Sequence, residues 1–235
     1  MTCIPGLAQH GAAIFAHEQL AGKGQRGKYW IAEKDANILL SIVVKPRPLQ
    51  LAQQFQLSAC VAVALHDFFM KYAGDNSKIK WPNDLYWQDR KAGGILVESV
   101  VRSEGALAGA DLAPGQWDWA IIGIGVNINQ PSFPSNLPNP VSLKQITGKD
   151  FRVVSLAKEL CTVLENYLQQ LITSGFENIY SKYISNLYKK GSVIKLKMGN
   201  RVFEATLKTV SPLGKLIVQH ALEEEFDFGE VEWII

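Results

Sequence analysis

Lys80-Trp-Pro-Asn-Asp-Leu-Tyr-Trp-Gln-Asp-Arg-Lys-Ala-Gly-Gly-Ile-Leu-Val-Glu98 is the part of this 235-residue chain where chemically distinctive residues are most concentrated. Its proline favours a turn, and Asn83 and Asp84 add oxygens that suit a hard cation or a hydroxyl group. Gly93-Gly94-Ile95-Leu96-Val97 then reads as a buried strand whose first two residues let a ligand lie against the backbone. Lys91 stands at its start, where a desolvated lysine can bind a carboxylate or a phosphate.

The composition indicates a globular protein without a strong overall charge. Hydrophobic residues make up 47% of the chain, and 24 basic against 22 acidic residues give a formal net charge of +2. This balance gives no general attraction for nucleic acid, so any anion is bound locally. The apolar runs are shorter than the roughly 20 residues of a membrane-spanning helix, and the N-terminus has no secretory pattern. We therefore expect no binding to a membrane. Three widely spaced cysteines favour reduced thiols and a cytoplasmic protein.

Hydrophobic periodicity predicts two structural units. The first contains strands and helices, with strands at residues 12–16, 38–44, 97–101 and 119–128 and helices at 49–72, 155–172 and 176–187. The last two strands flank a loop at 102–115 and are expected to form a hairpin. The second unit consists of short alternating runs at residues 192–198, 201–210, 215–219 and 225–233. We therefore expect a domain at residues 1–188 and a small antiparallel barrel at 189–235.

A second candidate site is the glycine-rich basic segment Gln19-Leu-Ala-Gly-Lys-Gly-Gln-Arg-Gly-Lys-Tyr-Trp30. Backbone amides freed by glycine, beside Lys23, Arg26 and Lys28, are suited to phosphate. The spacing matches neither of the common phosphate signatures, and a solvated basic loop is the alternative interpretation. Trp30 favours binding, because a large aromatic ring beside a phosphate site can stack on adenine.

A third candidate is Gly123-Ile-Gly-Val-Asn-Ile-Asn129, a strand whose two glycines open its surface. The amide of Asn127 can both donate and accept hydrogen bonds, as recognition of an adenine edge requires. Taken alone, the segment is equally compatible with a bulge followed by a turn.

Together, the three segments resemble the biotin-protein ligase family, whose members activate biotin with ATP and attach it to a lysine of a carrier protein. The family's Gly-Arg-Gly-Arg-Arg-Gly-x-x-Trp loop has its counterpart here, with Lys23 and Gln25 in place of two arginines. Its Lys-Trp-Pro-Asn-Asp block, Lys-x-x-Gly-Ile-Leu-x-Glu segment and Gly-x-Gly-x-Asn strand follow in the same order. The resemblance covers essentially the whole chain. It implies an α+β fold, with a mixed β-sheet flanked by helices as in class II aminoacyl-tRNA synthetases and lipoate ligases, followed by a small SH3-like β-barrel.

The resemblance also implies roles for individual residues. The catalytic residues would be Lys91, Asp84 and Lys23. Biotin would be bound by Gln19, Gly22, Lys23, Lys91, Gly94 and Gly123. ATP and the adenylate would be bound by Gly24, Gln25, Arg26, Gly27, Lys28, Trp30, Asn83, Asp84, Gly125 and Asn127. Asp84 would in addition hold Mg²⁺.

The implied activity is that of an ATP-dependent, AMP-forming ligase that makes biotinyl-5′-AMP and transfers biotin to a biotin carboxyl carrier protein. The carrier would be a subunit of acetyl-CoA carboxylase, and the cofactors would be ATP and Mg²⁺. Two alternatives stay open: a lipoate or octanoate ligase or transferase of the same fold, and a non-catalytic homologue that binds biotin or a carrier. We expect a monofunctional type without a DNA-binding domain. Whether it forms a homodimer through its sheet is open.

Overall fold

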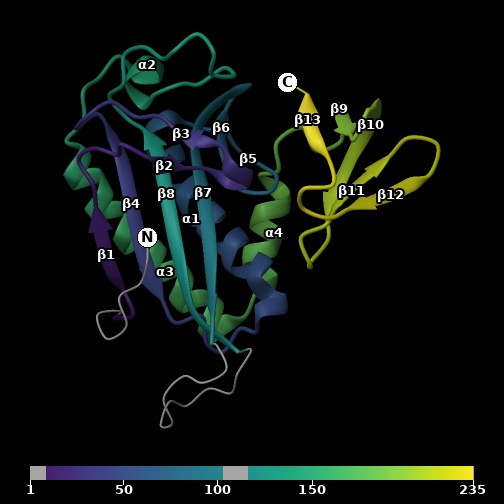
Figure 1. The fold of residues 1–235 in the computed structure, drawn as a ribbon, viewed down its shortest axis with the longest axis horizontal. Coiled ribbons are helices and arrows are strands. Elements are labelled where there is room, and N and C mark those ends of the chain that lie inside the picture. The colour runs from purple at the N-terminus through teal and green to yellow at the C-terminus, as the bar shows by residue number, and fades with distance from the viewer. Residues whose placement is uncertain (1–8, 103–115, 235) are drawn as a thin grey trace.

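A six-stranded antiparallel sheet forms the centre of the structure (Figure 1), a computed structural model that describes residues 9–102 and 116–234. In spatial order its strands are β1 (Ala12–Phe15), β4 (Asn37–Val44), β8 (Trp117–Asn127), β7 (Arg90–Val101), β6 (Asp84–Trp87) and β5 (Ser77–Lys80). All pairings between these strands are antiparallel, and the only described parallel contacts are two isolated bridges. The expected sheet had both parallel and antiparallel pairs, whereas the described strand pairs are antiparallel. One reason is that β5, β6, β7 and β8 are neighbours both in sequence and in space, which favours antiparallel pairing.

The predicted hairpin of the strands at 97–101 and 119–128 is confirmed by the pairing of β7 with β8. β7 is longer than expected, because it starts at Arg90 and contains both glycines of the Gly-Gly pair. Of the loop predicted at residues 102–115, residues 103–115 lie outside the described part of the chain.

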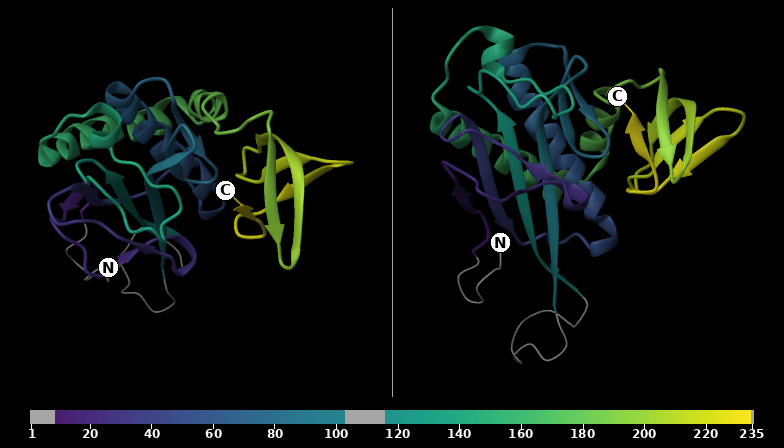
Figure 2. Two further views of the ribbon diagram at one scale, coloured as in Figure 1. Left: turned by 90° about the horizontal axis from the view of Figure 1, so that it is seen from above. Right: turned by 45° about the horizontal axis from the view of Figure 1, so that its top comes forward.

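Helices cover one face of the sheet, as the view from above shows (Figure 2). They are α1 (Gln54–Ala73), α3 (Val153–Ser174) and α4 (Glu177–Ser185), with a short α2 (Leu143–Thr147) near one end of the sheet. A 3₁₀ turn, η2 (Leu51–Gln53), precedes α1, so this helix begins later than its sequence pattern predicted. All residues from Ala59 to Leu65 of α1 are buried, because the helix packs against the sheet, α3 and α4. No helix of the described residues is long and apolar enough to cross a membrane.

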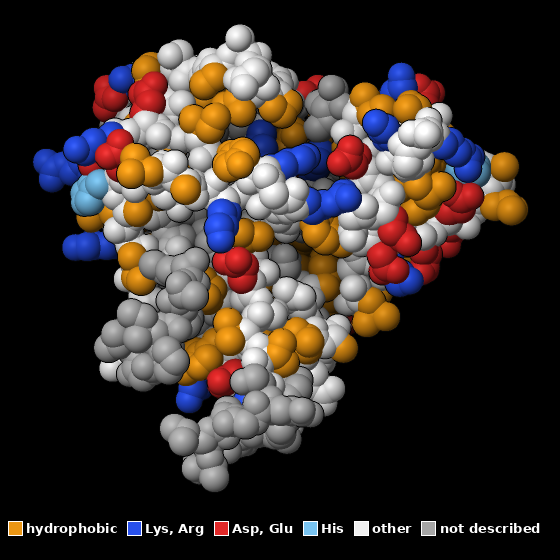
Figure 3. Space-filling view, in the orientation of Figure 1, with side chains coloured by type: hydrophobic (Ala, Val, Ile, Leu, Met, Phe, Trp, Pro, Cys, Tyr) orange, Lys and Arg blue, Asp and Glu red, His pale blue; other side chains and the backbone are white. Residues whose placement is uncertain are grey.

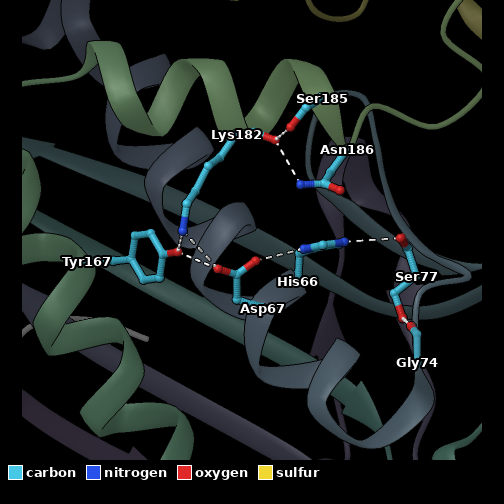
Figure 4. Close-up of polar contacts among 8 residues, drawn as sticks. All are labelled: His66, Asp67, Gly74, Ser77, Tyr167, Lys182, Ser185 and Asn186. Carbon is cyan, nitrogen blue, oxygen red and sulfur yellow. Dashed lines mark hydrogen bonds and ion pairs between the residues drawn. The ribbon is translucent and has the colours of Figure 1, made fainter.

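A partly buried polar network ties α1 to its neighbours (Figure 4). Asp67 accepts hydrogen bonds from Tyr167 Oη (2.5 Å) on α3 and Lys182 Nζ (3.3 Å) on α4. The ring of His66 lies between Asp67 Oδ1 (3.0 Å) and the carbonyl oxygen of Ser77 (3.1 Å). Burial by itself would raise the pKa of Asp67, but hydrogen bonds from His66 and Tyr167 and the charge of Lys182 lower this pKa to about 2. The network therefore favours an ionised carboxylate at the junction of three helices.

The C-terminal part forms a second sheet, drawn in yellow and green beside α4 (Figure 1). In spatial order its strands are β12 (Glu223–Phe226), β11 (Leu216–Gln219), β10 (Arg201–Val210), β9 (Val193–Met198) and β13 (Glu232–Ile234). The prediction of one run at residues 225–233 is wrong. A turn containing Gly229, whose φ is +95°, ends β12, and β13 then pairs with β9 at the opposite edge.

Among the contacts that hold this sheet against the larger unit, two lie at the turn before β11. The indole Nε1 of Trp81 donates a 2.8 Å hydrogen bond to the carbonyl oxygen of Gly214, in the turn before β11. A Cβ atom at Gly214 would lie 2.5 Å from the ring of Phe55, so only glycine lets this turn lie so close to α1. The Lys-Trp-Pro-Asn-Asp block thus connects the two sheets.

Candidate active site

A cavity of about 1050 Å³ lies where the helix-free face of the first sheet, the glycine-rich segment and the C-terminal sheet meet. Figure 3 shows Lys and Arg side chains gathered in the hollow beside the C-terminal sheet. The predicted site residues that line it are Gln19, Lys23, Gly24, Gln25, Arg26, Lys28, Trp30, Asn83, Asp84, Lys91, Gly94, Gly123, Gly125 and Asn127. Three segments that are distant in sequence therefore converge on one site, whose size suits a small-molecule ligand.

Gly22 and Gly27 are the two predicted site residues that do not line the cavity. Gly22 lies in β2 (Gly22–Lys23), which pairs with β3 (Tyr29–Trp30). A Cβ atom on Gly22 would lie 2.4 Å from the carbonyl oxygen of Trp30, so its glycine lets these strands approach. Gly27 has a φ of +75° and ends the 3₁₀ turn η1 (Gln25–Gly27). Both glycines shape the loop that carries the lining residues.

An ion pair between Lys91 and Asp84 forms the centre of the cavity wall. Lys91 Nζ lies 2.6 Å from Asp84 Oδ1, and the two side chains are 29% and 20% exposed. Asp84 is opposite Gly94 in the pairing of β6 with β7. A Cβ atom at Gly94 would lie 3.3 Å from Asp84 Oδ1 and 3.5 Å from Lys91 Nζ, so its absence leaves room for the pair. The carboxylate therefore holds the ammonium in place before any ligand arrives.

Asn83 is buried and holds the turn that precedes Asp84. Its side-chain amide donates to the carbonyl oxygen of Ile95, and the amide of Ile95 donates to the carbonyl oxygen of Asn83 (3.1 Å). The hydroxyl of Tyr183, on α4, donates to the carbonyl oxygen of Pro82 (3.0 Å). The donor of Asn83 is thus engaged with the backbone, which fixes the position of Asp84.

Trp30 lies directly on the surface of the sheet at Gly125. A Cβ atom at Gly125 would lie 2.5 Å from Cε2 and 2.7 Å from Cζ2 of the indole, closer than any side chain allows. The Trp30 ring can therefore occupy this position only because residue 125 is glycine. The indole Nε1 is buried and has no hydrogen-bond partner among the described residues.

Asn127, at the end of β8, is 4% exposed. Its Nδ2 donates to the carbonyl oxygens of Val141 (3.2 Å) and Lys91 (3.4 Å). Because both amide protons are used in this way, the side-chain oxygen is the part of Asn127 that can interact with a ligand. The sequence alone did not distinguish its donor from its acceptor.

The glycine-rich segment is tied back on itself and to the C-terminal sheet. The amide of Gly24 donates to the carbonyl oxygen of Lys28 (2.6 Å), which closes the basic loop. Arg26 adopts the left-handed conformation, with φ 55° and ψ 39°, and its Nη1 lies 3.7 Å from Glu232 Oε1 on β13. The loop thus presents its cations to the cavity while a strand from the other sheet contacts it.

The C-terminal sheet contributes to this cavity, which was not predicted from the sequence. The lining residues from this part of the chain are Phe228, Gly229, Val231, Glu232, Trp233 and Ile234. Their alternating pattern predicts strands but carries no information about which face meets another sheet. Lys80, the first residue of the Lys-Trp-Pro-Asn-Asp block, also lines the cavity.

The side chains of the cavity can bind Mg²⁺ only together with a bound ligand that supplies further oxygens. In the described part of the chain, no group of three or more His, Cys, Asp or Glu side chains could hold a metal ion. Mg²⁺ commonly uses one or two carboxylates and takes its other ligands from phosphate oxygens and water. Asp84 can supply such a carboxylate, since one of its oxygens contacts Lys91 and the residue lines the cavity.

Comparisons with known proteins identify the family. A model of the biotin/lipoate A/B protein ligase family matches residues 6–109. The biotin–acetyl-CoA-carboxylase ligase of Paracoccus denitrificans is 30% identical over 221 residues, which cover 92% of this chain and 86% of that protein. The bifunctional ligase/repressor BirA of Bacillus spizizenii is 28% identical over 216 residues, or 90% of this chain, which spans 62% of that protein. The solved structure of the Aquifex aeolicus biotin protein ligase in complex with biotin and ATP has the same fold, with a TM-score of 0.79 at 23% identity over 96% of this chain and 90% of that one. The extent of the match to the Paracoccus enzyme shows that this chain belongs to the biotin protein ligases of the biotin/lipoate A/B protein ligase family.

Proposed function

We propose that this protein is an ATP-dependent ligase that activates biotin as biotinyl-5′-AMP and transfers the biotinyl group to a lysine of a biotin carboxyl carrier protein. The main supporting observation is the convergence of the glycine-rich segment, the Lys80–Glu98 run and the Gly123–Asn129 strand on one cavity. The Paracoccus relative carries the name of such a ligase, and the Aquifex structure contains biotin and ATP. The carrier by this reasoning is a subunit of acetyl-CoA carboxylase.

In the first step, a carboxylate oxygen of biotin attacks the α-phosphorus of ATP, and pyrophosphate leaves. The two reactants are anions, so cations must reduce their repulsion and stabilise the charge that develops. Lys91, positioned by Asp84 at 2.6 Å, is the residue we assign to the oxygen between the carboxyl and phosphate groups. Lys23, Arg26 and Lys28 line the cavity from the glycine-rich side and would contact the phosphates. Asp84 would hold Mg²⁺, which supplies further positive charge at the phosphates when bound.

In the second step, the amine of the acceptor lysine attacks the biotinyl carbonyl carbon, and AMP leaves with the bond electrons. The amine must give up a proton in this step. Asp84 is the carboxylate that we assign to orienting the amine or accepting that proton, because it lines the cavity beside Lys91. The mixed anhydride must be kept from water between the two steps, and the glycine-rich segment over the cavity can provide this cover.

For the nucleotide, we assign Trp30 and Asn127 to adenine recognition. The indole lies on Gly125 at one wall of the cavity, where an aromatic ring can stack on a base. The side-chain oxygen of Asn127 can accept a hydrogen bond from the adenine amino group, since its Nδ2 is already used. Gln19, Gly94 and Gly123 line the remaining wall, which we assign to biotin.

We also propose the domain division at residues 1–188 and 189–235, with the C-terminal strands forming an SH3-like barrel. For a homodimer, the supporting feature is β1, which lies at an edge of the first sheet and pairs with β4 alone among the described strands. Two copies could join their sheets through this edge. Sedimentation velocity would test the dimer, and a monomer at every accessible concentration would exclude it.

The activity is tested by mixing purified protein with biotin, ATP, Mg²⁺ and a biotin carrier domain. We expect pyrophosphate release and a carrier whose mass increases by one biotinyl group. Parallel reactions replace biotin with lipoate or octanoate, because enzymes of the same fold can use these acids. Labelling with lipoate or octanoate instead of biotin, or no reaction with any of the three acids, would refute the proposal.

A further inference from the structure

Lys80 is a second buried lysine at the wall of the cavity, next to the pair of Lys91 and Asp84. It is the last residue of β5, is only 9% exposed and lines the cavity. The pairing of β5 with β6 places it opposite Asp84. No hydrogen bond or ion pair joins its ammonium group to another described residue, and the nearby Asp84 contacts Lys91 instead.

Two aromatic rings surround this ammonium group. Lys80 Nζ lies 5.6 Å from the ring centroid of Tyr86, on β6, and 4.9 Å from the ring centroid of Trp233, on β13 of the C-terminal sheet. Cation–π attraction compensates part of the desolvation of a buried ammonium, but it does not neutralise the charge. Lys80 therefore presents an unpaired cation to the cavity between two aromatic walls.

The charges around Lys80 favour an anionic ligand. Burial, together with the charges of Lys91 and Lys28, lowers the pKa of Lys80 to about 8, although the charge of Asp84 opposes this shift. Two other lysines thus act on Lys80 against a single carboxylate, that of Asp84, and this carboxylate is engaged with Lys91. A multiply charged phosphate chain would balance the excess, whereas a single carboxylate group would already be served by Lys91.

We propose that Lys80 is a phosphate-binding residue of this site, whose ammonium group binds the polyphosphate chain of ATP and the departing pyrophosphate. Trp233 covers this ammonium from the C-terminal sheet and limits its contact with water. The inference rests on the proposed ligase function and assigns the polyphosphate end of the nucleotide within it. Lys91 then binds the oxygen between the carboxyl and phosphate groups, and Lys80, on the other side of Asp84, binds the polyphosphate.

In this assignment, the C-terminal strand β13 positions cations of the phosphate-binding region. Its consecutive residues Glu232 and Trp233 contact Arg26 of the glycine-rich segment and Lys80 of the first sheet, respectively. One short strand therefore positions two of the cations that surround the cavity. Trp81, the residue after Lys80, donates a hydrogen bond to Gly214. This bond holds the C-terminal sheet next to Lys80.

The test uses a Lys80→Met variant, which removes the charge but retains an unbranched side chain between the two rings. The control is Lys78→Met on the same strand, because Lys78 lines a separate hollow of about 740 Å³ and not this cavity. Calorimetry with the full-length protein measures binding of α,β-methylene-ATP with Mg²⁺, of AMP and of biotin. We expect Lys80→Met to weaken binding of the ATP analogue by roughly 10- to 100-fold, the loss of one charge-assisted hydrogen bond. Binding of AMP and biotin should stay within about twofold, as should all binding by Lys78→Met.

Unchanged affinity of Lys80→Met for the ATP analogue would overturn the assignment. An equal loss for AMP, biotin and the ATP analogue would also overturn it, because that pattern indicates a structural role. If the unaltered protein binds neither biotin nor the ATP analogue, the proposed ligase function itself fails. Retained biotin binding by Lys80→Met serves as the check that the variant is folded.

Discussion

Replacing Gly125 with Ala tests whether the position of Trp30 on the sheet matters for nucleotide binding. The new Cβ would lie 2.5 Å from Cε2 of the indole, whereas ordinary contact begins at 3.4 Å. The ring must therefore withdraw by the difference, 0.9 Å, or the β2–β3 pair must move with it. Displacements of about 1 Å at a binding site can reduce activity by about 100-fold. We expect a loss of this order in adenylate formation, with a cost in stability of about 1–3 kcal/mol for the added atom.

Gly123→Ala is the matched control for the position of the Trp30 ring. Gly123 lies two residues earlier on the same strand and the same face, but its Cβ would meet only the carbonyl oxygen and Cβ of Leu96, at 3.6 Å and 3.8 Å. The place of the ring can be followed by fluorine NMR of protein labelled with 5-fluorotryptophan, with Trp30→Phe to assign the resonance. We expect this resonance to shift in Gly125→Ala and to stay in Gly123→Ala. An unshifted resonance together with unchanged ATP affinity in Gly125→Ala would refute the reasoning.

Three further substitutions test other parts of the structure. Lys91→Ala should lower the rate of adenylate formation by roughly 100-fold or more, because it removes a positioned cation. Circular dichroism should show an unchanged fold. Normal pyrophosphate release by this variant would show that the assignment of Lys91 is wrong. Asp67→Asn should lower the free energy of unfolding at neutral pH by about 1–2 kcal/mol, a value reduced for the 28% exposure of the carboxylate. The folded pKa of Asp67, about 2, is below its ordinary 3.8, so this contribution is present above the ordinary pKa and is lost as the pH falls towards the folded pKa. Urea unfolding at a series of pH values should show the difference between wild type and Asp67→Asn shrinking over that interval, and a constant difference would contradict the argument. Tyr183→Phe should cost about 1–3 kcal/mol in urea unfolding, since it leaves the partly buried carbonyl oxygen of Pro82 without its 3.0 Å donor. A loss below about 0.5 kcal/mol would show that water replaces the hydroxyl.

Much of the fold could be predicted from local patterns. The apolar segment that became α1, the amphipathic pattern of α3 and the alternating runs of the C-terminal sheet all depend on residues a few positions apart. Such patterns encode which backbone conformation buries apolar side chains, and they were sufficient for most elements. They failed at residues 225–233, because alternation continues across the turn at Gly229 where the chain crosses to the opposite edge of the sheet.

The sequence by itself determined the chemical groups of the site: the lysines, the carboxylate and the glycines of three separate segments. Only the tertiary structure decided how they are used. It engaged the donors of Asn83 and Asn127 with backbone carbonyls, placed Trp30 on Gly125, and brought Trp233 over Lys80. The physical reason is that these contacts join residues far apart in the chain, so they depend on how two sheets and a loop pack together. Local propensity carries no information about that packing.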